Sequence, residues 1–231
     1  MLNSSRLSLM VMLTTALVGA SAFAQVPPTP AEAAAYSGLF AAASRGDAAA
    51  IARLVTQGAD VKARDGYGRT PLHVAAYARQ QEAMRALAKA GADPDALESD
   101  RYDIITIAAV ADDPVTLKTA LDIGGNPRNV TSRYDGTALI AAAHLGHDEV
   151  VRMLIAAGAP LDHVNNLHWT ALIESIVLGN GGPRHVATLK ALVEAGASVK
   201  LTDRGGNTPL ALAKGRNYIE MVGILEKAGA R

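Results

Sequence analysis

The sequence predicts an all-helical solenoid of about six helix-turn-helix repeats, and three observations support this prediction. A Gly-Ala pair, weaker in the third copy, recurs at intervals of 33, 33, 34, 38 and 33 residues, at Gly58, Gly91, Gly124, Gly158, Gly196 and Gly229. A Thr-Pro-Leu-like block precedes each of these glycines, by 21 residues in five copies and by 26 in the fifth. Hydrophobic residues make up 49 % of the chain but aromatic residues only 4 %, so most apolar side chains are small or aliphatic. Self-similarity at a fixed period of this length is typical of repeat solenoids.

The first element, residues 1–24, has the layout of a secretory signal peptide. Arg6 precedes an apolar stretch from Leu7 to Val18, and Ala22-Phe23-Ala24 forms an Ala-x-Ala cleavage site. The alternative is a transmembrane anchor, but the stretch is short for a bilayer, which needs about 20 apolar residues. We therefore expect cleavage after Ala24 and export to the periplasm, with full secretion as the second choice. No later segment of spanning length lacks a charge, so we expect no membrane association after cleavage.

Residues 25–35 form a short, proline-rich lead-in, and six predicted repeats follow it. Their expected ranges are about 36–65, 66–98, 99–132, 133–165, 166–203 and 204–231. A Ser, Thr or Asp at the start of each block predicts an N-cap, whose side-chain oxygen accepts a hydrogen bond from the first helical turn. These expected caps are Ser37, Thr70, Asp103, Thr137, Thr170 and Thr208. Pro71 and Pro209 follow two of them, at a position where a missing N–H costs little.

A second helix is predicted in each repeat from apolar residues at helical spacing. In the fourth repeat these include Val151, Leu154 and Ile155. The alanine pair in each of the first four first helices, such as Ala75-Ala76, lets neighbouring helices approach closely. The glycine after the second helix suits a left-handed cap, and the chain then turns through a β-hairpin-like finger into the next repeat.

Two repeats depart from this pattern. Lys214 stands where earlier copies have Ala or Ile, which suits a solvent-facing surface on the last repeat of a stack. The fifth repeat carries five extra residues, Asn180–Arg184, whose Asn, Gly and Pro content predicts a loop between its two helices. That loop is either a contact loop or a tolerated insertion, since lengthening a surface loop costs little free energy.

The repeated unit resembles the ankyrin repeat. The resemblance is carried by TPLHVAA at 70–76, GHDEVVRMLIAAGA at 146–159 and DRGGNTPL at 203–210, and it extends over about 36–231. It implies an all-helical solenoid linked by β-hairpin-like fingers. It also implies a protein-binding role, with recognition by the finger tips and the exposed end of each first helix.

Placed by that resemblance, the candidate partner-binding residues follow from their offset to the capping residue. They are Tyr67, Arg69, Tyr77, Tyr102, Tyr134, His144, Leu167 and Trp169. Six of the eight aromatic residues of the mature chain occupy these offsets, including Tyr36 in the first copy. Tyr and Trp dominate binding hot spots, so we expect a partner to contact them. The alternative is that the finger aromatics pack on adjacent fingers and only brace the stack.

The sequence argues against the other classes of function. With no cysteine and a net charge of zero, thiolate chemistry and nucleic-acid binding are disfavoured. His144, His147, His163 and His168 could form a metal cluster, but the repeat consensus or solvated fingers explain them, so we expect no metal. His73 belongs to the repeat motif and is expected to be structural. Since no nucleophile is paired with a base, we expect neither catalytic residues nor a cofactor.

Together these features predict a monomeric, exported module, of the kind found among bacterial periplasmic ankyrin repeat proteins, which binds another protein. Some small periplasmic members of that kind resemble accessory factors in peroxide defence, which extends the analogy to stress defence. Two alternatives remain open: a secreted, host-directed ankyrin effector, and an enzyme of unrecognised type. Export beyond the cell envelope would favour the effector, and a cleft with perturbed ionisable groups would favour the enzyme.

Overall fold

The computed structural model describes residues 25–231, and the predicted signal peptide and its cleavage site lie outside the described residues. Within this range there are thirteen helices, and the strand-like pairing is one isolated bridge between Thr131 and Gly136. The helices are α1 (Pro30–Ala35), α2 (Gly38–Arg45), α3 (Ala48–Thr56), α4 (Pro71–Tyr77), α5 (Gln81–Lys89), α6 (Ile104–Val110), α7 (Pro114–Asp122), α8 (Ala138–Leu145), α9 (Asp148–Ala156), α10 (Ala171–Val177), α11 (Pro183–Glu194), α12 (Pro209–Gly215) and α13 (Ile219–Lys227). The predicted all-helical repeat solenoid is confirmed. None of the described helices is long and apolar enough to cross a membrane.

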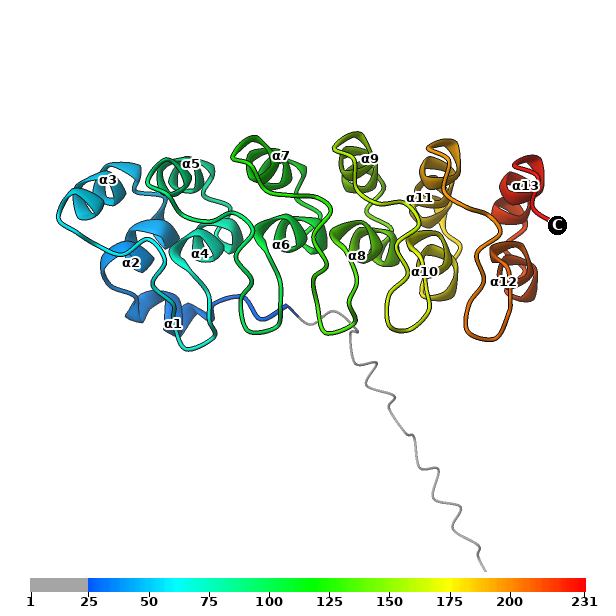
Figure 1. The fold of residues 1–231 in the computed structure, drawn as a ribbon, viewed down its shortest axis with the longest axis horizontal. Coiled ribbons are helices and arrows are strands. Elements are labelled where there is room, and N and C mark those ends of the chain that lie inside the picture. The colour runs from blue at the N-terminus through cyan, green and yellow to red at the C-terminus, as the bar shows by residue number, and fades with distance from the viewer. Residues whose placement is uncertain (1–24) are drawn as a thin grey trace, which may run out of the picture.

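The helices form two parallel rows (Figure 1). The first helices of the pairs, α2, α4, α6, α8, α10 and α12, form the lower row, and the second helices form the upper row. Each predicted repeat range contains one such pair. The finger loops project downward beside the lower row. We call the face made by the first helices and the fingers the inner face.

The predicted caps explain where the first helices begin. The side chains of Thr70, Thr137, Thr170 and Thr208 each accept a hydrogen bond from a backbone N–H in the first turn, as does Asp103. Pro71 and Pro209 occupy the first turn, as expected. Ser37 differs, because its side chain makes no cap hydrogen bond. Ser37 stands at the predicted N-cap position of α2, but the predicted side-chain hydrogen bond is not formed.

The core lies between the rows and between successive pairs. Ala43, Ala76, Ala109 and Ala143 are fully or almost fully buried, which lets the first helices pack closely. Larger side chains fill the space between the two rows, and Leu154 of α9 has no exposed surface. The predicted register of α9 is therefore correct.

Only part of the insertion in the fifth repeat forms a loop, whereas the sequence predicted a loop over all five residues. Pro183 and Arg184 belong to α11, because proline is well suited to open a helix. The remaining loop is held in place: Tyr218 Oη donates to the Gly179 carbonyl at 2.9 Å. A Cβ at Gly179 would collide with the Ser175 carbonyl oxygen, so this close approach requires glycine.

The last repeat ends the stack with a polar surface. Lys214 keeps 54 % of its side chain exposed and pairs with Glu226 at 2.8 Å. The expected solvent-facing position of Lys214 is confirmed, and it explains why a charge replaces the small or apolar residue of earlier repeats.

Candidate protein-binding surface

The finger loops are joined to one another by backbone hydrogen bonds. Ser99 N donates to Tyr67 O at 3.0 Å, Ser132 N to Arg101 O at 2.9 Å, and Asn166 N to Tyr134 O at 2.9 Å. Each of these bonds links one finger to the next. The second to fifth fingers therefore form a continuous edge along the inner face.

Each finger tip is also held by a polar side chain at its own base. Asp65 Oδ1 accepts from the backbone N–H groups of Tyr67 and Arg69, both at 2.9 Å. Asn165 Oδ1 accepts from those of Leu167 and Trp169, both at 3.0 Å. This local bonding is the role expected of Asp at finger starts. It orders the tips in the free protein, which lowers the entropy cost of binding through them.

The third and fourth fingers carry a reciprocal pair of ion pairs. Arg101 Nη1 lies 2.7 Å from Asp135 Oδ1, and Arg133 Nη2 lies 2.8 Å from Asp100 Oδ1. These side chains are partly exposed, so each pair stabilises the fold by less than about 1 kcal/mol. Their crossed arrangement still sets the relative position of the two tips.

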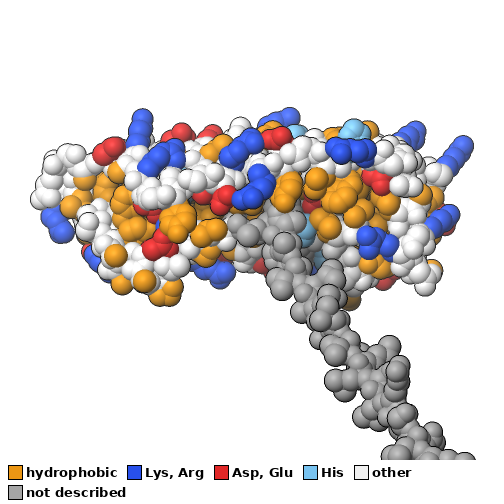
Figure 2. Space-filling model, turned by 90° about the horizontal axis from the view of Figure 1, so that it is seen from below, with side chains coloured by type: hydrophobic (Ala, Val, Ile, Leu, Met, Phe, Trp, Pro, Cys, Tyr) orange, Lys and Arg blue, Asp and Glu red, His pale blue; other side chains and the backbone are white. Residues whose placement is uncertain are grey.

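The predicted binding residues differ widely in exposure. Tyr67 is 44 % exposed, whereas Tyr77, Tyr134, His144, Leu167 and Trp169 are half-buried. Seen from below, hydrophobic side chains gather in two areas, over the N-terminal repeats and again toward the C-terminal repeats (Figure 2). The binding roles of these six residues stay predictions.

Arg69 and Tyr102 do not fit the predicted surface. Arg69 is 1 % exposed and Tyr102 is 4 % exposed, so neither side chain has the exposed position that was predicted for it. Both directly precede the capping residue of a first helix. Tyr102 packs into the hydrophobic core, and this burial raises the pKa of its hydroxyl to about 12.

Arg69 is the buried centre of an ionic network. Its Nε lies 2.7 Å from Asp65 Oδ2 and its Nη2 lies 3.2 Å from Glu32 Oε1. Burial acts to raise the pKa of Asp65, but hydrogen bonds from Tyr36 and Arg69 outweigh it and hold that pKa below its usual range. The guanidinium also lies 4.5 Å from the centre of the Tyr67 ring, an attractive cation–π arrangement. Arg69 therefore supports the exposed Tyr67 from below.

The lead-in covers part of the inner face, which the sequence analysis did not predict. Its Pro27, Pro28 and Ala33 line a cavity of about 90 Å³ together with Tyr77 and other residues of the first two repeats. A sequence signal was present: Thr29 and Glu32 form a capping box that starts α1. The lead-in is thus a folded element and not a flexible linker.

Glu174 is an inner-face residue whose role no sequence pattern indicated. It is 1 % exposed, and its carboxylate accepts from Asn165 Nδ2 at 2.8 Å and lies 3.2 Å from His144 Nδ1. Burial raises the pKa of Glu174, although its bonds to His144 and Asn165 oppose the rise. The cluster fastens the fifth finger to the fourth and fifth first helices, which holds Trp169 in place.

Three of the four histidines considered as metal ligands, His144, His147 and His163, are within hydrogen-bond distance of protein groups. His147 Nδ1 lies 2.9 Å from Ala109 O, and His163 Nε2 lies 2.6 Å from Asp135 O. Among the described residues, no group of three or more His, Asp or Glu side chains is arranged to hold a metal ion. His73 has the expected structural role: its Nδ1 accepts from Thr70 N at 3.1 Å and its Nε2 lies 3.2 Å from Tyr102 O.

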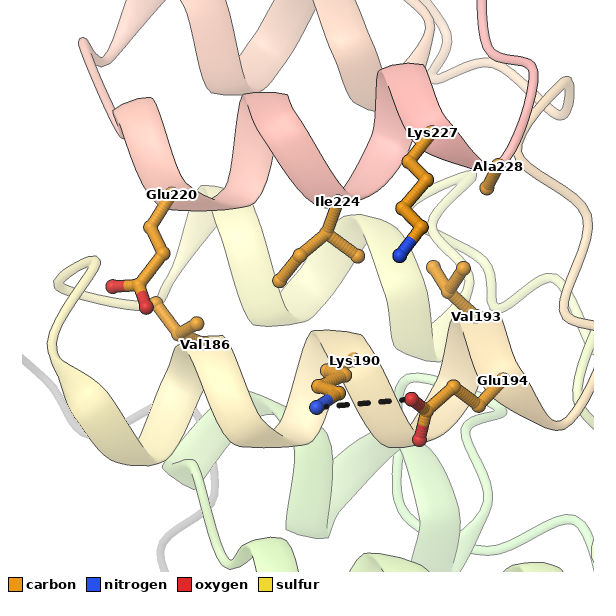
Figure 3. Close-up of a pocket in the computed structure, with 8 residues that line it drawn as sticks. All are labelled: Val186, Lys190, Val193, Glu194, Glu220, Ile224, Lys227 and Ala228. Atoms are coloured by element: carbon orange, nitrogen blue, oxygen red, sulfur yellow. Dashed lines mark ion pairs between the residues drawn. The ribbon is translucent and has the colours of Figure 1, made fainter.

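A groove of about 430 Å³ lies on the opposite side, between α11 and α13 (Figure 3). Val186, Val193 and Ile224 line it, and Lys190 and Glu194 form a 3.8 Å ion pair at its edge. This groove belongs to the second-helix row. It has no residue in common with the predicted binding surface.

Comparison with known proteins agrees with the helix pairs and the finger edge. A family profile described as ankyrin repeats in three copies matches residues 16–98 and 105–203. The chain belongs to the ankyrin repeat family, whose members are generally protein-interaction modules without enzymatic activity.

Similar proteins come from bacteria and animals. The ankyrin repeat protein YahD of Escherichia coli is 33 % identical over 82 % of this chain and 94 % of its own length. A crystal structure of an ankyrin repeat domain from Acinetobacter baumannii has 41 % identity and a TM-score of 0.78, covering 84 % of this chain and 98 % of that one. The B-cell lymphoma 3 protein homolog of Mus musculus is 29 % identical over 74 % of this chain, which spans 38 % of that longer protein.

Proposed function

We propose that this chain is an exported module that binds a periplasmic protein through its finger tips and the inner face of its C-terminal repeats. The observation that carries the proposal is the ordered finger edge that presents Tyr67 and Trp169. Their tips are held by Asp65 and Asn165, so a partner can bury aromatic surface at a low entropy cost. Aromatic side chains of this kind supply much of the binding energy in protein interfaces.

The free inner face lies toward the C-terminal end. The lead-in covers the first repeats, where it contacts Arg69 and lines the cavity beside Tyr77. Leu178, beyond the end of α10, is 38 % exposed. It adds an apolar residue to the half-buried Leu167 and Trp169 of the same repeat. We therefore place the principal contact on the fourth and fifth repeats, with Tyr67 as a second point.

Capture of the partner tests this function. A tagged chain, crosslinked in the periplasm, should retain one or more specific proteins. The double variant Tyr67→Ala with Trp169→Ala should lose at least about 2 kcal/mol of binding, roughly a thirtyfold decrease in affinity. The matched control is Val115→Ala with Ile219→Ala, since these side chains are 62 % and 70 % exposed and begin second helices.

Binding retained by the aromatic double variant but lost in the control would contradict the proposed surface and place the contact on the second-helix row. Export is tested separately, by the N-terminal sequence of the periplasmic protein. Gln25 as the first residue supports cleavage after Ala24, and a retained Met1 in the stable product contradicts export.

A further inference from the structure

We propose that the lead-in, Gln25–Ala35, acts as a ligand of the inner face of the first three repeats and competes there, at the second contact point beside Tyr67, with a segment of a partner. The kind of segment that fits is a proline-containing peptide that is non-helical over its first five residues, continues into a short helix and carries one acidic side chain in that helix. This inference rests on the proposed function only because it describes one segment of the proposed partner. Its test needs no identified partner.

The lead-in is attached at both ends and spans three repeats. At its start, Gln25 Nε2 donates to the Thr106 carbonyl of α6 at 3.0 Å. Just after its end, Tyr36 Oη donates to Asp65 Oδ2 at 2.7 Å. Between these points it runs along the lower row of helices beneath the second repeat (Figure 1). The segment is non-helical over residues 25–29 and helical over Pro30–Ala35, and both extended and helical segments are usual forms of peptide ligands.

The contacts of the lead-in define what its binding surface on the inner face, here called the lead-in site, recognises. Arg69 Nη1 donates to Val26 O at 3.2 Å, and Arg69 Nη2 pairs with Glu32 Oε1 at 3.2 Å. One buried guanidinium thus binds both a backbone carbonyl and a carboxylate of the segment. Pro27 and Pro28 lie against the cavity that Val74 and Tyr77 also line. Prolines lose little entropy when they bind in an extended form.

The covered state is imperfect at Tyr77. Its hydroxyl is buried without a hydrogen-bond partner, although Tyr77 lines the same cavity as the two prolines. Burying a hydroxyl without a partner is unfavourable. A segment that places a hydrogen-bonding group at this point would satisfy the hydroxyl. Val26 and Thr29 also stay exposed, so the lead-in buries only part of its own surface. Both features favour exchange over permanent docking.

The experiment measures binding of a fluorescent peptide with the sequence of residues 25–36. Two full-length mature proteins are compared, the natural one and a released variant with Glu32→Gln, Pro27→Gly and Pro28→Gly. These changes lie outside the six repeats, and circular dichroism confirms that both proteins are folded. We expect the released variant to bind the peptide at least tenfold more tightly, because its own lead-in no longer occupies the lead-in site.

Three controls make the result specific. The exposed Ala31 is changed to Ser in a matched variant, which should bind the peptide as weakly as the natural protein. A peptide carrying Gln in place of the glutamate should bind the released variant more weakly, since it cannot pair with Arg69. The single variant Glu32→Gln should show an intermediate affinity.

Equal peptide binding by the natural and released proteins, or equal binding of a scrambled peptide, would overturn the inference. A concentration-dependent dimer of the natural protein that exchanges lead-ins between copies would also overturn it, because each lead-in site would then be occupied by the lead-in of the other copy. Peptide binding that fails while partner capture still depends on Tyr67 and Trp169 would reject this inference alone. The reverse pattern would reject the proposed function alone.

Discussion

Tyr102 and Trp169 stand at the same position of their fingers, directly before a capping residue, yet they differ in burial. Tyr102 is 4 % exposed and lies in the core, whereas Trp169 is half-buried. Because the role of an aromatic residue depends on this difference, one position in the repeat serves stability in one copy and is free to serve recognition in another. The offset from the cap alone could not separate the two roles.

Single truncations should separate them. Tyr102→Ala should lower the free energy of unfolding by about 3 kcal/mol, the usual scale for a large aromatic side chain removed from a core. Trp169→Ala should change it by less than about 1 kcal/mol while weakening partner binding. Urea unfolding of both variants checks the first part, and titration with the partner checks the second. Equal losses of stability would assign the Trp169 ring to bracing of the finger stack.

His73 should make stability depend on pH. Burial lowers the pKa of His73 from 6.5 to about 4, so the unfolded chain binds a proton there more readily than the folded one. Stability should therefore fall as the pH decreases from about 6.5 to about 4, by about 3 kcal/mol over that window. His73→Gln should remove this part of the slope, because the Gln side chain does not titrate. The variant should keep its fold, since Gln can replace His73 at the N3 position of the capping box.

Chemical unfolding at several pH values from 4 to 7 provides the measurement. The buried carboxyl groups of Asp103 and Glu174 have raised pKa values caused first by burial, and they act in the opposite direction. Only the difference between the natural protein and His73→Gln isolates the histidine. An identical slope in both proteins would mean that the folded chain accepts a proton at His73.

At the scale of the element, the sequence predicted the helix pairs well because each uses short-range signals. A capping Thr, Pro71 or Pro209, and apolar spacing all act within a few residues. The insertion was predicted less well, since Pro183 opens α11 whereas Pro in that context also suits a loop. The lead-in was missed for a different reason. Its contacts with Thr106 and Arg69 join residues 81 and 43 positions apart, which no local pattern reveals.

Leu154→Asp should disrupt the fourth repeat. Leu154 has no exposed surface in α9, and an unpaired buried charge costs several kcal/mol. The matched control is Ala156→Asp, which places the same charge at an exposed position of the same helix. Thermal unfolding followed by circular dichroism should show a large loss for the first variant and a small one for the second. A Leu154→Asp protein as stable as the control would mean that α9 packs through another face.

At the scale of the whole molecule, stability should not depend on a metal ion. His147 is hydrogen-bonded to the Ala109 carbonyl of the third repeat, and His163 to the Asp135 carbonyl of its own, fourth repeat, which suits a structural role. We expect the same thermal midpoint with and without EDTA. A midpoint that falls by several degrees and returns when zinc is added would contradict this expectation.

The span of the lead-in also determines the order in which the repeats should open. It connects the first repeat to α6 of the third, whereas α12 and α13 pack against α10 and α11 on one side of the stack. Repeat arrays lose structure most easily from an end that only one neighbour supports. Amide hydrogens of α12 and α13 should therefore exchange with solvent first, and those of α4 and α6 last. Measured by mass spectrometry, protection should decline from the N-terminal half toward Arg231, and cutting the lead-in contacts should flatten that gradient.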